Sequence, residues 1–466
     1  MNLHGPLFRL MRSLAAGAAV ALAGCGVFPI ITPDMAPPDP GSVQFQTASG
    51  RVLSPERSKQ IIAQLSQGDA RSDMLARHLA VEQQLAGSPL SLGNRVTLLQ
   101  NGPDTYAAML SAISDAHDHI NMETYIFEDD DAGRRFADAL LAKQRAGVQV
   151  NLIRDSVGTL GTPRAFFDRL QHAGIAVVEF NPVDPLRAKA GWDVNQRDHR
   201  KLLVVDGRTA VLGGINISSV YSGGSSVHIG KSENNMNVPW RDTDLQIDGP
   251  VVATLQKLFM ATWSDQKGPP LASRNYFPPL AADGQEVVRV IGSGPDQTVN
   301  LNYVTLLSAI NSAEHDVLLT NAYFVPDPQL IHTLISAVGR GVNVEMIVPS
   351  VSDSSLVFNA GRAHYEELLR SGVRIYERRQ ALLHSKTALI DGVWATVGST
   401  NLDWRSFLHN QELTAVILGP EFGAKMREAF ERDLTESDQI SLAKWERRPL
   451  NTRAKEWFGR LWEYWL

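Results

Sequence analysis

The sequence predicts an α/β protein made of two homologous domains, and three observations lead to this expectation. The chain has 466 residues, which is more than a single hydrophobic core usually organises. From Val96 onward, strand-like and helix-like patterns alternate, as they do in layered α/β folds. The second half of the chain then repeats the order of elements found in the first half. We therefore expect two duplicated domains packed about a pseudo-two-fold axis.

The chain opens with the pattern of a secretory signal peptide. Arg9 and Arg12 form a basic start, and the apolar run from Ser13 to Ala23 is too short to span a bilayer comfortably. The run ends in Leu-Ala-Gly-Cys, which resembles a bacterial lipobox, and Cys25 is the only cysteine of the chain. This resemblance implies that the Cys25 thiol receives a diacylglycerol and that cleavage before Cys25 leaves it as the new N-terminus. The acyl chains, for example palmitate, would hold the protein at a membrane.

These features predict a bacterial membrane-anchored lipoprotein that faces the periplasm. Gly26 follows the cysteine where an aspartate would be expected for inner-membrane retention, so we expect sorting to the outer membrane. The segment Pro29–Pro40 carries five prolines in twelve residues and predicts an extended tether. Ser54 and Pro55 then have the pattern of a helix N-cap and a first helical residue.

Each half shows the same succession of strand, helix, strand, helix and strand. The segments 117–129 and 314–327 take the same place in the two halves and match Tyr125 with Tyr323. In the first half the five elements are expected at 95–102, 105–116, 119–127, 132–147 and 148–155, and in the second half at 286–294, 302–313, 316–325, 328–341 and 342–350.

The domain boundaries follow from these patterns. A stretch rich in Pro, Ser and Gly, without a clear period, separates the two halves and reads as a linker. We expect a signal peptide at 1–24, a Pro-rich tether and helical lead-in at 25–75, a first domain at 76–264, a linker at 265–284, a second domain at 285–440, and a basic, Trp-rich amphipathic tail at 441–466.

Charge and composition exclude some classes of function. The formal net charge is -6 and the pI is about 6.1, whereas a protein that binds long nucleic acids is more often basic. We therefore expect no nucleic-acid partner. The four consecutive carboxylates from Glu128 to Asp131 directly precede a predicted helix, where they favour the helix dipole, so we do not expect them to bind a metal. No metal and no cofactor are predicted.

A short string of residues occurs twice at the same spacing. In each copy a lysine follows a histidine by two residues, an aspartate follows the histidine by seven, a glycine follows the aspartate by seven, and an asparagine follows the glycine by three. A single His-x-Lys is a weak signal, but two copies that agree over this whole frame indicate a functional site. The copies are His199, Lys201, Asp206, Gly213 and Asn216, and then His384, Lys386, Asp391, Gly398 and Asn401.

The residue types in the repeat fit chemistry on a phosphate group. In a strand, residues i and i+2 share a face, so each histidine points the same way as its lysine. The Asp-Gly pair predicts a hairpin that returns Asn216 toward His199 and Asn401 toward His384. One histidine would attack phosphorus and form a phospho-histidine, and the other would act as general acid and base. The lysines and asparagines would stabilise the charge on the phosphate oxygens.

Each histidine also needs an acceptor that orients its second ring nitrogen. Asp242 and Glu412 lie downstream of the two motif copies in similar apolar surroundings. We expect Asp242 to orient His199 and Glu412 to orient His384. Two further motif residues lie at the hairpin turns and are expected to be structural rather than catalytic: Asp206 and Asp391.

These motifs resemble the phospholipase D superfamily, and four strings resemble its bacterial cardiolipin synthase branch: "LAGSPLSLGNRVTLLQNG", "AYFVPD", "WRDTDLQIDGP" and "GSTNLDWRSFLHNQE". The resemblance covers about Arg77 to Asp433. It implies one α-β-α sandwich per domain, with a single active site at the interface of the two. It also implies ping-pong transfer of a phosphatidyl group, with His199 as nucleophile and His384 as general acid and base.

Two segments depart from this core. The polar, Gly- and Ser-rich stretch Tyr221–Val238 contains His228 and Lys231 and reads either as a flap over the site or as a solvated surface insertion. The tail carries four of the nine tryptophans, and its cations outnumber its anions six to three. A helical stripe in it would suit a bilayer interface, although it could instead dock on the protein itself. The stripe is Trp457, Phe458, Leu461, Trp462 and Trp465.

The sequence therefore predicts a cardiolipin-synthase-type phosphatidyltransferase, with anionic phospholipid as substrate and with the membrane contacted through acylated Cys25 and the tail. It would join two phosphatidylglycerols and release glycerol, or move a phosphatidyl group to another alcohol. The alternative is a phospholipase D that forms phosphatidic acid, because the two reactions differ only in the acceptor that reaches His384. A nuclease is disfavoured by the acidic charge, the lipobox and the Trp-rich tail. An inactive lipid-binding lipoprotein is disfavoured because both motif copies are intact.

Overall fold

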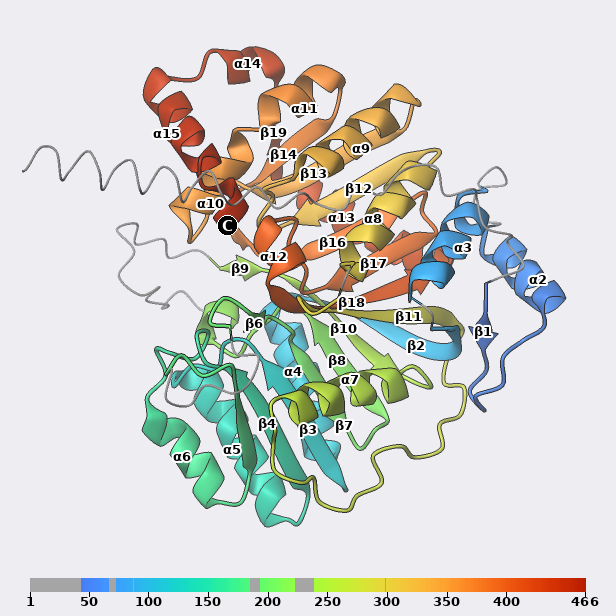
Figure 1. Ribbon diagram of the computed structural model, residues 1–466, viewed down its shortest axis with the longest axis vertical. Helices are drawn as coiled ribbons and strands as arrows, with labels where there is room; N and C mark the ends of the chain where they lie inside the picture. Colours follow the sequence, from blue (N-terminus) through green and yellow to red (C-terminus); the bar gives the residue numbers. More distant parts are fainter. Residues whose placement is uncertain (1–42, 67–72, 87, 185–192, 223–238, 298) are drawn as a thin grey trace, which may run out of the picture. The chain divides into compact units, whose positions relative to one another are not determined.

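The computed structural model describes residues 43–66, 73–86, 88–184, 193–222, 239–297 and 299–466 (Figure 1). The expected signal peptide, Cys25 and the Pro-rich tether lie outside these residues, as do His228 and Lys231. Within the described part of the chain, no helix combines the length and the apolar character needed to cross a bilayer.

The first half of the chain folds around a mixed sheet in the strand order β5-β4-β3-β7-β8-β10-β2. The strands β3, β4 and β5 are parallel, and the others pair antiparallel. Its elements are β2 (Leu90–Gln100), α4 (Asn101–Asp115), β3 (His119–Thr124), α5 (Asp131–Arg145), β4 (Gln149–Asp155), α6 (Arg164–His172), β5 (Ala176–Phe180), β6 (Arg197–Asp198), β7 (Leu202–Val205), β8 (Thr209–Gly213), η4 (Ser219–Tyr221), β9 (Trp240–Arg241), β10 (Thr243–Asp248) and α7 (Val252–Asp265).

The second half repeats this arrangement in the order β14-β13-β12-β16-β17-β18-β11, with β19 added beside β14. Its elements are β11 (Glu286–Ser293), α8 (Leu301–Ser312), β12 (Asp316–Asn321), α9 (Pro328–Gly339), β13 (Asn343–Pro349), α10 (Ser355–Arg362), α11 (Tyr365–Ser371), β14 (Arg374–Arg378), β15 (Leu382–Leu383), β16 (Lys386–Ile390), β17 (Trp394–Gly398), α12 (Trp404–Leu408), β18 (Asn410–Leu418), α13 (Pro420–Thr435), β19 (Ser437–Gln439), α14 (Leu442–Glu446), α15 (Leu450–Arg460) and η5 (Glu463–Trp465).

The two sheets join through their equivalent edge strands. β2 and β11 hold the same position in the two halves, and they pair antiparallel, with Glu286 beside Asn94 and Val288 beside Ser91. Antiparallel pairing of equivalent strands is what a two-fold axis generates. The expected α/β fold of two related halves is confirmed. Residues 266–285, all of which the structure describes, connect α7 to β11 without helix or strand.

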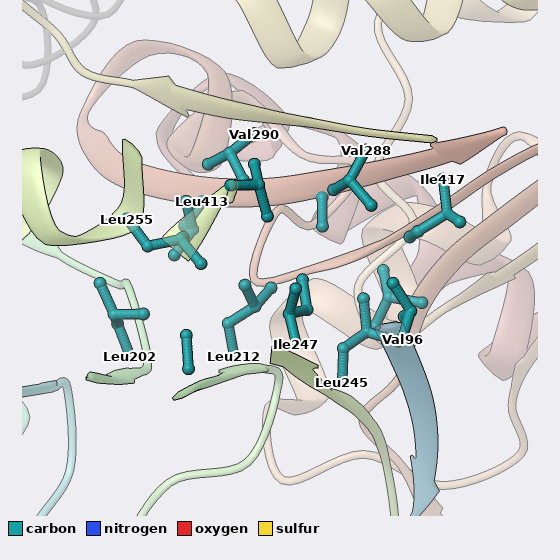
Figure 2. Close-up of a cluster of buried hydrophobic side chains, with 14 of the residues drawn as sticks. Val96, Leu202, Leu212, Leu245, Ile247, Leu255, Val288, Val290, Leu413 and Ile417 are labelled. Atoms are coloured by element: carbon teal, nitrogen blue, oxygen red, sulfur yellow. The ribbon is translucent and has the colours of Figure 1, made fainter. Parts of the chain in front are cut away.

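A continuous apolar core lies between the halves. Helix α7 of the first half and α13 of the second half contribute to it, together with strands of both sheets. Figure 2 shows side chains of the first half, such as Leu212 and Leu245, packed with Val290 and Leu413 of the second. A second cluster fills the space between α4, α5, α6 and the outer face of the first sheet. Each fully buried side chain of this kind stabilises the folded state by about 1.5–3 kcal/mol. The shared core therefore holds the two halves in one arrangement.

Two expected helix starts are confirmed. An N-terminal lead-in of β1 (Phe45–Gln46), α2 (Pro55–Leu65) and α3 (Met74–Ala86) precedes the first sheet. The Ser54 side chain accepts a hydrogen bond from the Arg57 N–H and caps α2. The acidic run ends at the start of α5, where the Asp130 carboxylate accepts from the Gly133 N–H at 2.8 Å. Asp130 and Asp131 therefore serve the helix terminus, as expected, whereas the Glu128 carboxylate accepts from the Ser218 hydroxyl.

One expected correspondence between the halves is wrong by one residue. In each half an isolated bridge joins a phenylalanine after the central strand to the residue that follows the motif asparagine. The two phenylalanines, Phe127 and Phe324, are therefore equivalent. Tyr125 lies two residues before its phenylalanine and Tyr323 only one, so these tyrosines are not equivalent. Similar strings of residues concealed the shift, because local likeness does not set strand register.

Candidate active site

The two motif copies present their histidines and lysines to one buried site. His199, Lys201, His384 and Lys386 are 8%, 5%, 4% and 4% exposed. In each copy the two side chains lie on one face of extended chain, because they are two residues apart. Burial and the charges of both lysines lower the pKa of each histidine. All four groups are therefore within electrostatic reach of one another, and the halves form a single site.

Each motif histidine lies beside the segment of the other half that carries its carboxylate partner. β6 runs parallel to the start of β18, and the His199 N–H donates to a β18 carbonyl at 3.0 Å. Likewise, β15 runs parallel to β9, and the His384 N–H donates to the Arg241 carbonyl at 2.8 Å. When each register is continued by one residue, His199 stands opposite Glu412 and His384 stands opposite Asp242.

This cross-pairing corrects the expected assignment of the orienting acids. His199 Nδ1 lies 3.1 Å from both carboxylate oxygens of Glu412, and His384 Nδ1 lies 2.7 Å from Asp242 Oδ2. The expectation that Asp242 orients His199 and Glu412 orients His384 is wrong. The spacing along the chain located the right acids, but the pairing depends on contacts between halves, which spacing does not encode.

The acids fix the imidazole tautomers. An ionised carboxylate only accepts hydrogen bonds, so the hydrogen shared with Glu412 is on Nδ1 of His199, and Nε2 keeps its lone pair. Glu412 is held in turn by the Ser399 hydroxyl at 2.5 Å. Asp242 accepts the Thr243 N–H at 2.8 Å through its other oxygen. Both imidazoles are therefore oriented before substrate binds.

The two His–carboxylate pairs differ in the pKa of the carboxyl. Burial opposes ionisation of Glu412, yet the contacts with His199 and Lys201 outweigh it and lower the pKa of this carboxyl. Burial raises the pKa of Asp242 to about 6, against the opposing charge of Lys386. Burial also lowers the pKa of His199 to about 4 and the pKa of His384 well below its usual range. Both imidazoles are neutral near pH 7.

The two lysines place positive charge in the same site. Lys201 Nζ donates to the His199 carbonyl at 2.5 Å, and Lys386 Nζ donates to the His384 carbonyl. Burial lowers the pKa of Lys201 to about 7 and the pKa of Lys386 to about 8, although Glu412 and Asp242 act in the opposite direction. An anionic phosphate in the site would raise the pKa of both lysines, because opposite charge favours the ammonium form.

The motif asparagines occupy different surroundings. Asn216 Oδ1 accepts the Ile126 N–H at 3.0 Å, and Asn216 Nδ2 donates to the Tyr221 hydroxyl at 3.2 Å. That hydroxyl lies 3.4 Å from His384 Nδ1, so Asn216 is connected through Tyr221 to the histidine of the other half. Asn401 Oδ1 is buried without a hydrogen-bonding partner among the described residues.

Sequence reasoning missed a set of aromatic rings around the histidines. The Tyr125 ring packs against His199, with 5.1 Å between ring centroids. Trp240, Tyr221 and Tyr323 surround His384 at 5.2, 5.9 and 6.3 Å. The sequence did offer a signal: Tyr125 and Tyr323 lie in the repeated strings, and the other two rings flank the Gly- and Ser-rich insertion. The structure describes neither residues 223–238 nor their side chains.

The motif aspartates do not contact the motif histidines among the described interactions. They accept hydrogen bonds from backbone N–H groups instead. Asp206 accepts the N–H groups of residues 117–119 at 2.8, 2.8 and 2.9 Å. Asp391 does the same for residues 314–316 at 2.9, 2.8 and 3.0 Å. Both begin their hairpin turns with positive φ angles of 51° and 50°. Each ties a hairpin tip to the start of the central strand, which is a structural position.

Two imidazoles that are each oriented by a carboxylate of the other half, with one lysine beside each, define a phosphoryl-transfer site of the phospholipase D type. Comparison with known proteins agrees. A family model described as "Cardiolipin synthase, PLD-like domain" matches residues 109–260 and 306–434. The chain therefore belongs to the cardiolipin synthase family of phospholipase D-like proteins, and it is a phosphatidyltransferase of that superfamily.

Individual relatives cover most of this chain. A cardiolipin synthase of Alkalihalophilus pseudofirmus is 33% identical over 381 residues, which are 81% of this chain and 73% of that protein. One of Geobacillus kaustophilus is 32% identical over 386 residues, or 82% and 74%. Among solved structures, a phosphatidylserine synthase of Haemophilus influenzae has a TM-score of 0.59 at 15% identity, with 83% of this chain and 99% of that chain covered. This last likeness supports the fold.

The position of Asp391 predicts a loss of stability without a loss of chemistry. Asp391→Ala leaves three backbone N–H groups without their acceptor, so we expect the free energy of unfolding to fall by about 2–4 kcal/mol. Asp391→Asn retains one carbonyl oxygen and should lose less. Denaturant unfolding measures this, alongside turnover per folded molecule. A turnover below about a tenth of wild type in the folded fraction would instead make Asp391 part of the catalytic machinery.

The buried lysines predict a gain of stability on their removal. The pKa of Lys201 is about 7 in the folded protein, below its unfolded value of about 10.5. Burying the charged lysine therefore lowers the free energy of unfolding increasingly as the pH falls from about 10.5, and the loss reaches its full size below about pH 7. Lys201→Met should therefore abolish turnover and raise stability by about 1–3 kcal/mol at pH 6.5. Thermal unfolding at pH 6.5 and pH 9.5 measures this, and the gain should shrink at the higher pH. The exposed Lys257, changed to Met, is the control. A Lys201→Met protein less stable than wild type at both pH values contradicts the expectation.

Proposed function

We propose that this protein is a phosphatidyltransferase of cardiolipin-synthase type that works through a phospho-histidine formed on His199. The observation that carries the proposal is the pair of cross-oriented histidines facing two lysines in one buried site. The relatives named cardiolipin synthase support cardiolipin as the product. In our proposal phosphatidylglycerol is the donor and glycerol is released. Our proposal also includes an acylated Cys25 that tethers the chain, facing the periplasm, to the outer membrane.

In the first step, the free Nε2 of His199 attacks the phosphorus of the donor lipid. The N–P bond forms as the P–O bond to the glycerol headgroup breaks, and the departing oxygen takes a proton from His384. The bound phosphodiester anion favours the protonated form of His384, because a neighbouring negative charge raises a histidine pKa. Glu412, which stays ionised, balances the positive charge that the phosphorylated imidazole acquires.

In the second step, the acceptor hydroxyl attacks the phospho-histidine. Neutral His384 removes the hydroxyl proton, the new O–P bond forms, and the N–P bond to His199 breaks. Lys201 and Lys386 stabilise the charge on the remaining phosphate oxygens in both steps. A second phosphatidylglycerol as acceptor gives cardiolipin, whereas water gives phosphatidic acid. The phosphorus is inverted twice, so the overall reaction retains its configuration.

Product analysis tests the proposed reaction. We expect the detergent-solubilised protein to convert phosphatidylglycerol into cardiolipin and an equimolar amount of glycerol, as measured by mass spectrometry. His199→Ala and His384→Ala should each lower this rate by at least about 10³-fold, because each removes a group needed in both steps. Phosphatidic acid as the only lipid product would instead establish hydrolysis. Unchanged turnover in His199→Ala would reject the phospho-histidine route.

A chromogenic donor separates the two steps and tests the cross-pairing. Phosphatidyl-p-nitrophenol has a leaving group that needs no protonation, so His384→Ala and Asp242→Asn should still release one burst of nitrophenolate per site. His199→Ala should show no burst, and Glu412→Gln should slow it about 10–100-fold, because the glutamate orients the nucleophile. Stopped-flow absorbance measures the burst. A burst slowed by Asp242→Asn but unaffected by Glu412→Gln would reverse the assignment of the two histidines.

A further inference from the structure

The C-terminal segment carries an apolar stripe on its exposed face. Its members, which we call the C-terminal stripe, are all between 47% and 65% exposed. They lie on α15, on the turn that follows it and on η5, in the dark red part of Figure 1. Large exposed apolar side chains gathered in this way mark an interaction site rather than ordinary surface. The stripe consists of Trp457, Phe458, Leu461, Trp462 and Trp465.

The opposite face of the same segment packs against the second half of the protein. Gly459 lies so close to α10 that a Cβ would stand 2.6 Å from the Ala360 nitrogen. The buried Glu456 accepts from Arg448 Nε at 2.7 Å, and Glu463 pairs with His364 at 2.9 Å. The segment therefore cannot rotate to bury its stripe against the second half, and the stripe stays available to a partner.

The charge around the stripe indicates the chemistry of that partner. Lys444, Arg447, Arg453 and Lys455 are exposed and form no ion pair within the described part of the chain. Tryptophan rings and basic side chains gathered in one short amphipathic segment suit the boundary between lipid headgroups and acyl chains, with anionic headgroups attracted to the cations. A protein partner would need matching acidic groups around an apolar groove, and a bilayer supplies both features over its whole surface.

The stripe is also fixed close to the active site. The Arg405 N–H of α12 donates to the Leu466 carbonyl at 2.8 Å, and the rings of Trp404 and Tyr464 are in contact at 5.4 Å. The short helix α12 connects the motif residue Asn401 to β18, which carries Glu412. The segment before α10 supplies Asp353, which accepts from the Tyr323 hydroxyl at 2.6 Å and acts on the charge state of His384.

We propose that the C-terminal stripe docks into the interface of an anionic phospholipid bilayer and thereby holds the active site beside its lipid substrate. The part of this inference that concerns the lipid substrate rests on the proposed function. The docking itself depends only on the stripe, on its flanking cations and on the rigid attachment of α15 to α10 and η5 to α12. The acyl group expected on Cys25 would keep the chain near the membrane, and the stripe would set its orientation.

Tryptophan quenching tests the docking directly on the full acylated protein. We expect vesicles of phosphatidylcholine and phosphatidylglycerol with brominated acyl chains to quench the fluorescence of the stripe. Replacing Trp457, Trp462 and Trp465 by Phe should remove most of this quenching while retaining vesicle binding. Trp457→Asn with Trp462→Asn should lower the bromolipid quenching of the remaining stripe residue Trp465 about 5-fold or more, although the acyl group keeps this variant on the vesicles. The same change at the exposed Leu160 and Phe277, outside the stripe, is the matched control and should leave the quenching intact.

Turnover separates this inference from the proposed reaction. The Asn variant should lose turnover on vesicles at least 10-fold and keep its turnover on short-chain phosphatidylglycerol dissolved as monomers. Quenching without any cardiolipin would leave the docking intact and reject the reaction. Normal turnover without quenching would reject the docking. A dimer in sedimentation that the Asn variant dissociates, with no bromolipid quenching of the wild-type stripe, would assign the stripe to a second copy of the chain instead.

Discussion

The active site depends on backbone pairing between the two halves of the molecule. The short strand before each motif histidine pairs with the segment of the other half that leads to the orienting carboxylate. The backbone N–H groups of His199 and His384 each donate to a carbonyl across this joint, at 3.0 and 2.8 Å. These pairings set the register that brings Glu412 to His199 and Asp242 to His384. Neither half on its own supplies both a motif histidine and the carboxylate that orients it. The joint and the apolar core beneath it are therefore part of the catalytic apparatus.

A nearly symmetric frame nevertheless holds two chemically different histidines. The Glu412 carboxyl has a lowered pKa and stays ionised, whereas burial raises the pKa of Asp242 to about 6. An imidazole beside a permanent carboxylate is suited to carry positive charge after it has attacked phosphorus. An imidazole beside a carboxyl that titrates near neutrality is suited to gain and lose protons. The difference between the two acids thus fits the division of labour between nucleophile and acid–base group, which the repeat alone does not distinguish.

The sequence predicted what is local and repeated, and it failed where contacts join the halves. The spacing identified both motif copies, the hairpins, and the backbone position of Asp206 and Asp391, because each depends on residues close together in the chain. The partners of the histidines were assigned wrongly, because the pairing of β6 with β18 joins segments 213 residues apart, as between His199 and Glu412. Tyr221 was missed because its role depends on a turn after the motif rather than on the motif itself.

Burial of the site also bears on the choice between transfer and hydrolysis. The two histidines and two lysines are at most 8% exposed, so the site would admit little bulk water around the proposed phospho-histidine. A lipid hydroxyl competes well only if it arrives at high effective concentration and in the right orientation. A site held against a bilayer by the C-terminal stripe would meet that condition, because acceptor headgroups are crowded at the same surface. Attachment at the stripe would then favour cardiolipin over phosphatidic acid, and a detached enzyme would lose that preference without any change in its catalytic groups.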